Sequence, residues 1–138
     1  MPRLCELCRE GKLVEVRSAL AGGEDVNSKD SSGRTALIIA VLNKHNSIVK
    51  LLLDQPAVDV NMKNDHGRTA LHYAAWSNNT EGARMLLLHK DISFNVTNNN
   101  GDSALMLAVR KRNEEVLREL VEHQCVSLDA GRLETDQR

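Results

Sequence analysis

The sequence predicts an all-α solenoid in which helix-turn-helix units are linked by hairpin-like loops. Three observations predict this fold class: a repeat of 34 residues, apolar side chains at helical spacing, and a scarcity of aromatic residues. Aromatic residues make up 2 % of the 138 residues, so the apolar volume must come mainly from Leu, Val, Ile and Ala. That composition favours helices over an aromatic-rich β-sandwich or barrel. The length suits a single domain.

The repeat is visible in several columns of residues. The tetrapeptide Arg-Thr-Ala-Leu at 34–37 recurs at 68–71, and 102–105 carries the related Asp-Ser-Ala-Leu. A constant step of 34 residues also separates Gly33, Gly67 and Gly101. Self-similarity at a period of this size is the mark of a repeat array, in which each unit packs only on its neighbours.

Each unit is predicted to contain a first helix, a polar turn and a second helix. The first helices are expected at about 36–42, 70–76 and 104–111. Thr35, Thr69 and Ser103 are expected to cap them, because a hydroxyl can accept a hydrogen bond from an unpaired N–H of the first turn. The second helices carry an apolar stripe at i, i+1, i+4 and i+5, as in Ile48, Val49, Leu52 and Leu53.

The repeats are predicted at about 1–29, 30–63, 64–97 and 98–129, which together form one domain over 1–129. The first unit lacks the turn that should precede its first helix, so we expect the two outer units to act as caps. The last residues, 130–138, are polar and are expected to form a flexible tail.

These motifs closely resemble the ankyrin repeat. The family element Asp-x-x-Gly-x-Thr-Pro-Leu-His-x-Ala-Ala is similar to 30–41, 64–75 and 98–109, although Ala stands at the usual Pro position and only His72 keeps the His. The family tail Gly-Ala-Asp-Val-Asn is similar to 23–27. The resemblance implies turns that project as fingers beside a concave face lined by first helices, and binding of other proteins through that face.

The same resemblance implies where a partner would make contact: in the fingers and at the ends of the first helices. The residues expected there are Arg34, Leu42, Asn43, Asp65, His66, Arg68, Trp76, Ser77, Asn99, Asp102, Arg110 and Lys111. Trp76 is expected to be an anchor, since Trp and Arg are common interface hot spots; the alternative is that it only covers Leu42 or stacks under Arg110. The expected partner is a protein that offers an apolar side chain flanked by acidic groups.

The predicted function is therefore a non-catalytic protein–protein interaction module, an adaptor or a competitive inhibitor. The alternative is a structural fragment of a larger scaffold with no partner of its own. The chain is expected to be monomeric. An odd number of three cysteines argues against a disulfide framework, which favours a reducing compartment, the cytoplasm or the nucleus.

Several other functions are disfavoured by the composition. A net charge of −1 gives no excess of positive charge for binding nucleic acid. No apolar run approaches the length of a membrane span. No nucleophile has a predictable His partner, so neither an enzyme nor a cofactor is expected.

Cys5, Cys8, His123 and Cys125 are potential zinc ligands, but a metal site is not expected. Stacked helix layers would place the first and last repeats about 30 Å apart, whereas zinc needs all its ligands within about 2.3 Å. The ankyrin resemblance also implies possible hydroxylation of Asn61 and Asn95. The alternative, which we favour, is that these side chains hold the turn backbone.

Overall fold

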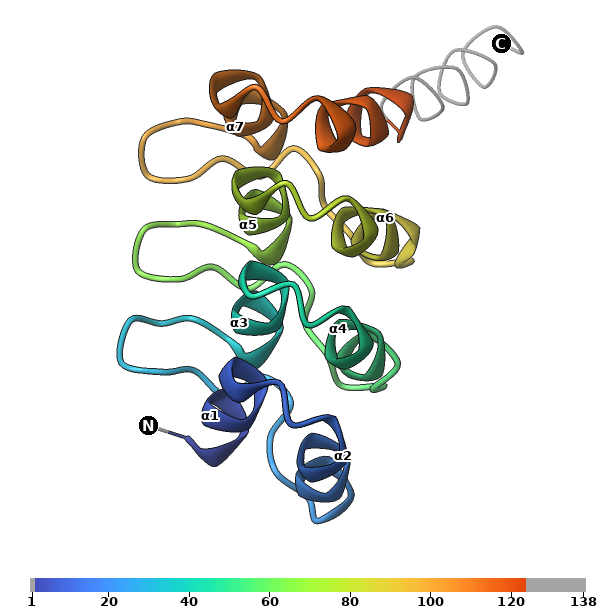
Figure 1. Ribbon diagram of the computed structural model, residues 1–138. Coiled ribbons are helices and arrows are strands. Elements are labelled where there is room, and N and C mark those ends of the chain that lie inside the picture. The colour runs from blue at the N-terminus through green and yellow to red at the C-terminus, as the bar shows by residue number, and fades with distance from the viewer. Residues whose placement is uncertain (1, 124–138) are drawn as a thin grey trace, which may run out of the picture.

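The structure is a computed structural model that describes residues 2–123, and it is a stack of helix pairs (Figure 1). The first helices are α1 (Arg3–Glu10), α3 (Ala36–Leu42), α5 (Ala70–Ser77) and α7 (Ala104–Lys111). The second helices are α2 (Leu13–Ala21), α4 (Asn46–Leu53) and α6 (Thr80–Leu88), followed by a last helix whose described part covers 114–123. The all-α solenoid predicted from the repeat is confirmed.

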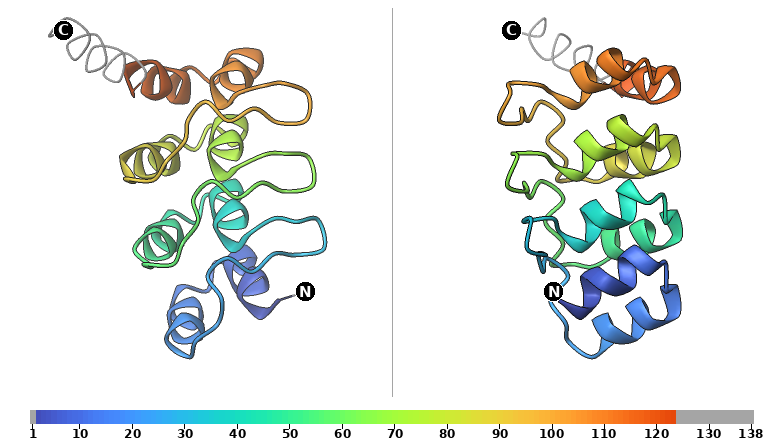
Figure 2. Two further views of the ribbon diagram at one scale, coloured as in Figure 1. Left: turned by 180° about the vertical axis from the view of Figure 1, so that it is seen from behind. Right: turned by 60° about the vertical axis from the view of Figure 1, so that its left-hand side comes forward.

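The helices form two columns that run the length of the stack. Each first helix packs on the next, α1 on α3, α3 on α5 and α5 on α7, while α2, α4 and α6 form the second column (Figures 1 and 2). Ala40, Ala74 and Ala108 are fully buried in the first column. Their small side chains allow neighbouring helices to approach closely, and one continuous apolar core results.

The predicted caps define where the first helices begin. Thr35 Oγ1 accepts from the N–H of Ile38 at 3.2 Å, and Thr69 and Ser103 accept in the same way from the residues three positions later. Each bond satisfies a donor that the first helical turn leaves unpaired. The expected helix ranges agree with the structure except that α5 extends one residue further, to Ser77.

Hairpin-like fingers connect the helix pairs and all project to the same side (Figure 2). In the finger at 64–68, Asn64 and Arg68 pair through a backbone hydrogen bond of 2.9 Å, and the fingers at 30–34 and 98–102 repeat this bond. Neighbouring fingers are also joined, because the N–H of Asp65 donates to Ser32 O and the N–H of Asn99 donates to His66 O. The fingers therefore form a ladder beside the first helices.

A second set of bonds joins the loops on the other edge of each repeat. Asn61 Nδ2 donates to Asp91 O at 2.7 Å, and Asn61 Oδ1 accepts from Ser93 N–H at 2.9 Å. Asn27 makes the equivalent pair of bonds with Ala57 and Asp59. These asparagines link each loop to the next, which explains why they recur at the repeat period.

None of the helices in the described part of the chain is both long enough and apolar enough to span a bilayer. The repeat boundaries at 29/30, 63/64 and 97/98 stay predictions. The end of the last repeat at 129 and the predicted tail at 130–138 lie outside the described residues.

His72 connects the third repeat to the fourth. It is 1 % exposed; its Nδ1 accepts from the N–H of Thr69 at 3.1 Å, and its Nε2–H donates to Asp102 O at 2.9 Å. This pattern requires the neutral imidazole. Burial is the main cause that lowers the pKa of His72 below its usual value, while the hydrogen bond to Asp102 acts in the opposite direction.

We expect this histidine to make the fold less stable in mild acid. The unfolded chain binds a proton at His72 near pH 6.5, whereas the folded chain resists protonation, so stability falls as the pH drops below about 6.5, by at most about 1.4 kcal/mol per pH unit. Urea unfolding of the wild type and of His72→Gln at pH 7 and pH 5 measures the effect. The variant should lose less stability over this interval; an equal loss in both proteins would contradict the assignment.

Candidate protein-binding site

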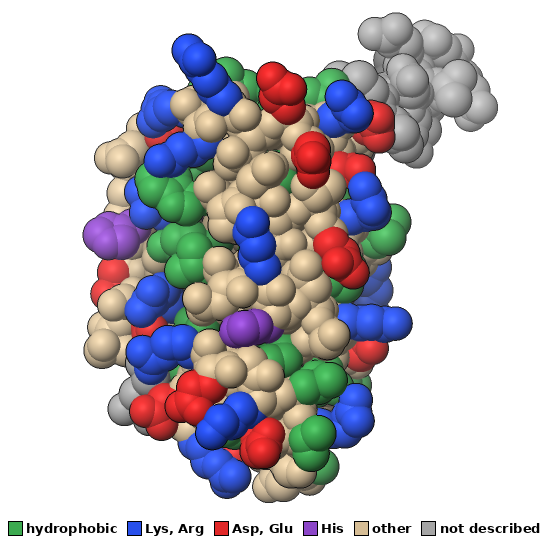
Figure 3. Space-filling model, in the orientation of Figure 1, with side chains coloured by type: hydrophobic (Ala, Val, Ile, Leu, Met, Phe, Trp, Pro, Cys, Tyr) green, Lys and Arg blue, Asp and Glu red, His purple; other side chains and the backbone are tan. Residues whose placement is uncertain are grey.

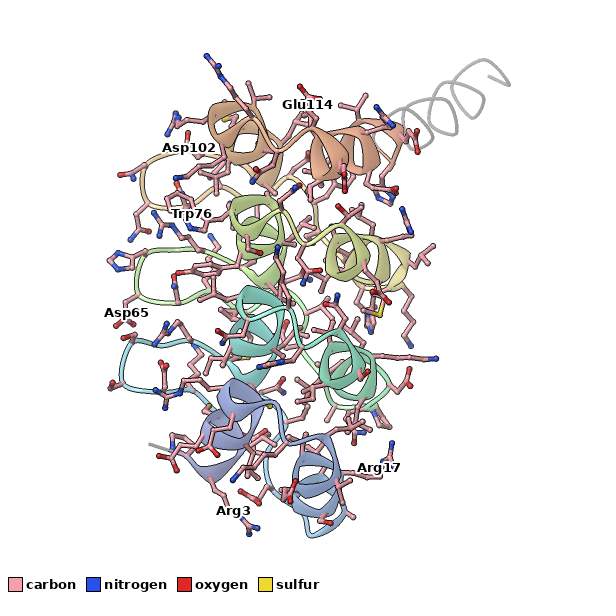
Figure 4. All side chains as sticks on the ribbon, in the orientation of Figure 1. Arg3, Arg17, Asp65, Trp76, Asp102 and Glu114 are labelled. Carbon is pink, nitrogen blue, oxygen red and sulfur yellow. The ribbon has the colours of Figure 1, made fainter. Side chains whose placement is uncertain are left out.

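The exposed aromatic residue of the finger side is Trp76, near the C-terminal end of α5. Its side chain is 41 % exposed and points toward the fingers (Figure 4). The predicted surface position is confirmed: the chain's one tryptophan lies outside the core. Residues 70–75 of the same helix are all buried, so only its last two residues, Trp76 and Ser77, reach the surface.

Two cations lie over the Trp76 ring. Lys111 Nζ is 3.6 Å from the ring centroid, and the guanidinium carbon of Arg68 is 5.6 Å from it. Arg68 also lies 6.0 Å from the centroid of Tyr73. Such cation–π contacts contribute about 0.5–1 kcal/mol when exposed, and more when water is excluded. Because the three side chains come from a finger, α5 and α7, the contact exists only when the third and fourth repeats are stacked.

Arg68 lacks the carboxylate that its counterpart one repeat earlier possesses. Arg34 Nε donates to Asp30 Oδ2 at 3.0 Å. The position of Asp30 is taken in the next repeat by Asn64, a neutral amide that donates to the hydroxyl of Tyr73 instead. Within residues 2–123 no hydrogen bond or ion pair reaches the Arg68 guanidinium, and its Nε is buried without a partner. The positive charge beside Trp76 is therefore not neutralised from within the described chain.

Asp102 and Arg110, both expected to contact a partner, pair with each other, and their contact with a partner stays a prediction. Asp102 is only 6 % exposed, and its two carboxylate oxygens accept from Arg110 at 2.7 and 3.0 Å. The pair is bidentate and buries the Asp102 carboxylate, whereas the Arg110 side chain is still 65 % exposed. The α7 cation that lies over the Trp76 ring is Lys111, the residue after Arg110.

The remaining predicted contact residues lie on the same side of the stack but differ in availability. Leu42 is half-buried and packs against the core. Asn43 is exposed, and its side-chain amide donates a hydrogen bond to Ile39 O. Ser77 donates to Tyr73 O and is partly buried. Asp65 (Figure 4), His66 and Asn99 are exposed in the fingers, and the Asn99 amide also donates to Asp65 O at 3.1 Å.

The two asparagines considered for hydroxylation differ in their surroundings. Both ends of the Asn61 amide bond the backbone of the loop in the following repeat, so the side chain has a structural role, but it joins two loops instead of holding its own turn. Asn95 is exposed, and the loop that would follow it at the repeat period falls outside the described residues. Hydroxylation of either residue stays a prediction, which the intact mass after co-expression with a suitable hydroxylase would test.

The cysteines of α1 are poorly suited to metal binding or nucleophilic chemistry. Burial is the main cause that raises the pKa of Cys5 to about 11 and that of Cys8 to about 12, so both are neutral thiols at physiological pH. His123 lies at the opposite end of the stack, where it packs edge-on against Phe94. Cys125, the fourth residue considered, is outside the described residues. In the part of the chain that is described, no cluster of three or more potential ligands is arranged to hold a metal ion.

Comparison with protein families agrees with this architecture. A family model for ankyrin repeats in three copies matches residues 4–98, and a model for a single ankyrin repeat matches 100–131. Because these matches cover almost the whole chain, the protein belongs to the ankyrin-repeat family. Members of this family act as protein–protein interaction modules, and this class of protein is the one defined by the helix stack and its exposed finger side.

The relatives among curated proteins share short segments only. The chain is 44 % identical over 50 residues to a mitochondrial disaggregase of Homo sapiens, which is 36 % of this chain and 7 % of that protein. It is 41 % identical over 54 residues to an L-asparaginase of Dirofilaria immitis, 39 % of this chain and 9 % of that protein. An ankyrin repeat-containing protein of Saccharomyces cerevisiae is 40 % identical over 55 residues, 40 % of this chain and 11 % of that protein. The two enzyme names describe whole proteins of which the match covers less than a tenth.

Proposed function

We propose that this chain is a non-catalytic adaptor or competitive inhibitor that binds a protein partner through its finger side. The partner places an apolar side chain against Trp76 and an acidic side chain beside Arg68 and Lys111. The stacked repeats hold these groups in place before binding, so little ordering entropy is lost on association. The buried reduced cysteines of α1 also support a reducing compartment, the cytoplasm or the nucleus, as the place of action.

One observation carries the proposal: a half-exposed tryptophan is bordered by two cations, neither of which pairs with a carboxylate in the described chain. A carboxylate from outside would complete the charge pattern that Asp30 provides for Arg34. Lys and Arg side chains follow the finger side of the stack (Figure 3). This favours an acidic partner, since complementary charge promotes encounter and fixes the orientation of binding.

The experiment is a comparison of Trp76→Ala with wild type in affinity capture, followed by titration of the captured partner. We expect the variant to bind at least about 30-fold more weakly, because a central aromatic hot spot contributes about 2 kcal/mol or more. Leu88→Ala is the matched control, since Leu88 is a still more exposed apolar side chain on the outer helix α6. Loss of about twofold or less with Trp76→Ala, or an equal loss with Leu88→Ala, would refute the proposed site.

A charge reversal separates the acidic from the apolar contact. Lys111→Glu should weaken binding at low salt while Lys111→Arg retains most of it, because only the first places a carboxylate over the Trp76 ring. If the two variants bind equally well, the partner contributes no acidic group at this position.

A further inference from the structure

The C-terminal end of the stack presents an apolar face of its own. We call it the stack-end face; it consists of Leu105, Met106, Val109, Leu117 and Val121, from α7 and the last helix. Met106 is 51 % exposed, Val109 56 % and Val121 43 %. Leu105, Met106 and Val109 line one shallow hollow together with Arg110. Large apolar side chains gathered on one face differ from single exposed residues, which are normal and need no explanation.

The repeat register shows what this face is built to contact. The residues that correspond to Met106 are Ile38 and His72, and those that correspond to Val109 are Val41 and Ala75; all four are buried. They are buried under the next helix pair, as shown by the bond from His72 to Asp102 O in the following repeat. The stack-end face thus continues the internal interface between repeats, and its shape fits another helix pair of the same kind.

The first helix at the opposite end of the stack does not offer a matching surface. The exposed residues of α1 include Arg3, Glu6 and Glu10, so its outer side is charged. Stacking that end on Met106 and Val109 would bury charges against apolar side chains, which costs several kcal/mol per ion. A second copy that extends the array head to tail is therefore disfavoured, and the surface that matches an apolar stack end is another apolar stack end.

We propose that two copies of this chain associate through their stack-end faces about a twofold axis. With the axis running between α7 and the last helix, α7 of one copy packs antiparallel on the last helix of the other. Such an interface is self-complementary and closed, so it stops at a dimer. This proposal replaces the expectation of a monomer, and it is independent of the partner site at Trp76.

The charges at the rim fit this arrangement. α7 ends in a basic run that includes Arg112, whereas the last helix begins with Glu114 and Glu115, and all three side chains are exposed. The twofold axis places the basic end of one copy beside the acidic start of the other copy's last helix. Opposite charges at the rim orient the pairing, while the apolar centre supplies most of the affinity.

Sedimentation equilibrium or light scattering over micromolar to millimolar concentrations tests the dimer with the full chain. The contact area of one helix pair is small, so association is expected in the micromolar range or weaker. The wild-type mass should rise from that of one chain toward twice that value. Val109→Glu should keep the single-chain mass at every concentration, and Val14→Glu, which changes a 68 % exposed valine in the first repeat, should behave like the wild type.

The possible outcomes are decisive. If the wild type keeps the single-chain mass at every concentration, the proposal is overturned. This result is expected if another segment, or no molecule, occupies the stack-end face. Species larger than a dimer overturn the twofold arrangement. Should Val109→Glu lose its helical circular dichroism, Val121→Glu on the other helix decides in its place: a dimer that survives this change does not use the stack-end face. The antiparallel pairing would be supported if Arg112→Glu weakened the dimer and the second change Glu115→Arg restored it.

Discussion

Replacement of Gly67 by alanine is expected to lower the free energy of unfolding by about 2–5 kcal/mol. Gly67 has φ +74°, a left-handed conformation that costs an ordinary residue about 1–2 kcal/mol. In addition, an added Cβ would lie 2.5 Å from Asn99 Oδ1 and 2.9 Å from Asn99 N. The backbone nitrogen cannot rotate away, so the substitution must push neighbouring fingers apart.

Gly101→Ala is the matched control for this prediction. Gly101 has a similar φ of +81°, but nothing lies within 4 Å of the position of its Cβ. Only the conformational cost should appear, about 1–2 kcal/mol. Urea unfolding of both variants measures the difference, which isolates the contact between fingers. If both variants lost the same free energy of unfolding, neighbouring fingers would move apart with no energetic penalty.

Asn79→Ala is expected to cost about 2–3 kcal/mol, because one buried amide performs two structural tasks. Asn79 is a buried N-cap of α6 whose Oδ1 accepts from Gly82 N–H at 3.0 Å. Its Nδ2 donates to Val41 O at 3.0 Å and to Asn46 Oδ1 at 2.8 Å, both in the preceding repeat. The substitution removes the cap and a tie between the second and third repeats together.

Asn43→Ala serves as the comparison. Asn43 is also an asparagine at a helix end, but it is exposed and its side chain bonds only within its own helix, to Ile39 O at 2.9 Å. Its removal should cost about 0.5 kcal/mol or less, as for most surface substitutions. Thermal or urea unfolding distinguishes the two cases. If both variants lose the same stability, the link across repeats contributes nothing.

The fold could be predicted in detail because the information is local and is repeated. Thr35, Thr69 and Ser103 cap helices through atoms three residues away, and Gly33 requires its positive φ within a single turn. Short-range requirements of this kind leave the same mark in every unit, so a column of identical residues shows them directly. The inter-loop role of Asn61 was harder to predict, since its partners are about thirty positions away in the chain.

The candidate site was predicted less completely. The surface position of Trp76 followed from the ankyrin resemblance, which places the end of each first helix on the contact face. The pairing of Arg110 with Asp102 was not predicted, because the register compares positions and not charges: Asp102 stands where the earlier repeats have Arg34 and Arg68, and it binds Arg110. The sequence did contain a signal for this ion pair, because Asp102 is acidic where the two earlier repeats have a basic residue. Arg68 likewise lacks an ion-pair partner in the described chain because Asn64 stands where the preceding repeat has Asp30.

The sequence alone thus predicts the helix positions, the caps and the register of the units, since each depends on neighbours within a few positions. The sharing of charge between Asp102, Arg110 and Lys111, and the exposure of Val109 at the end of the stack, depend on which helix pair lies next to which. Those contacts exist only after the repeats have packed, because packing decides which side chain reaches a given partner and which apolar surface is left without a neighbour.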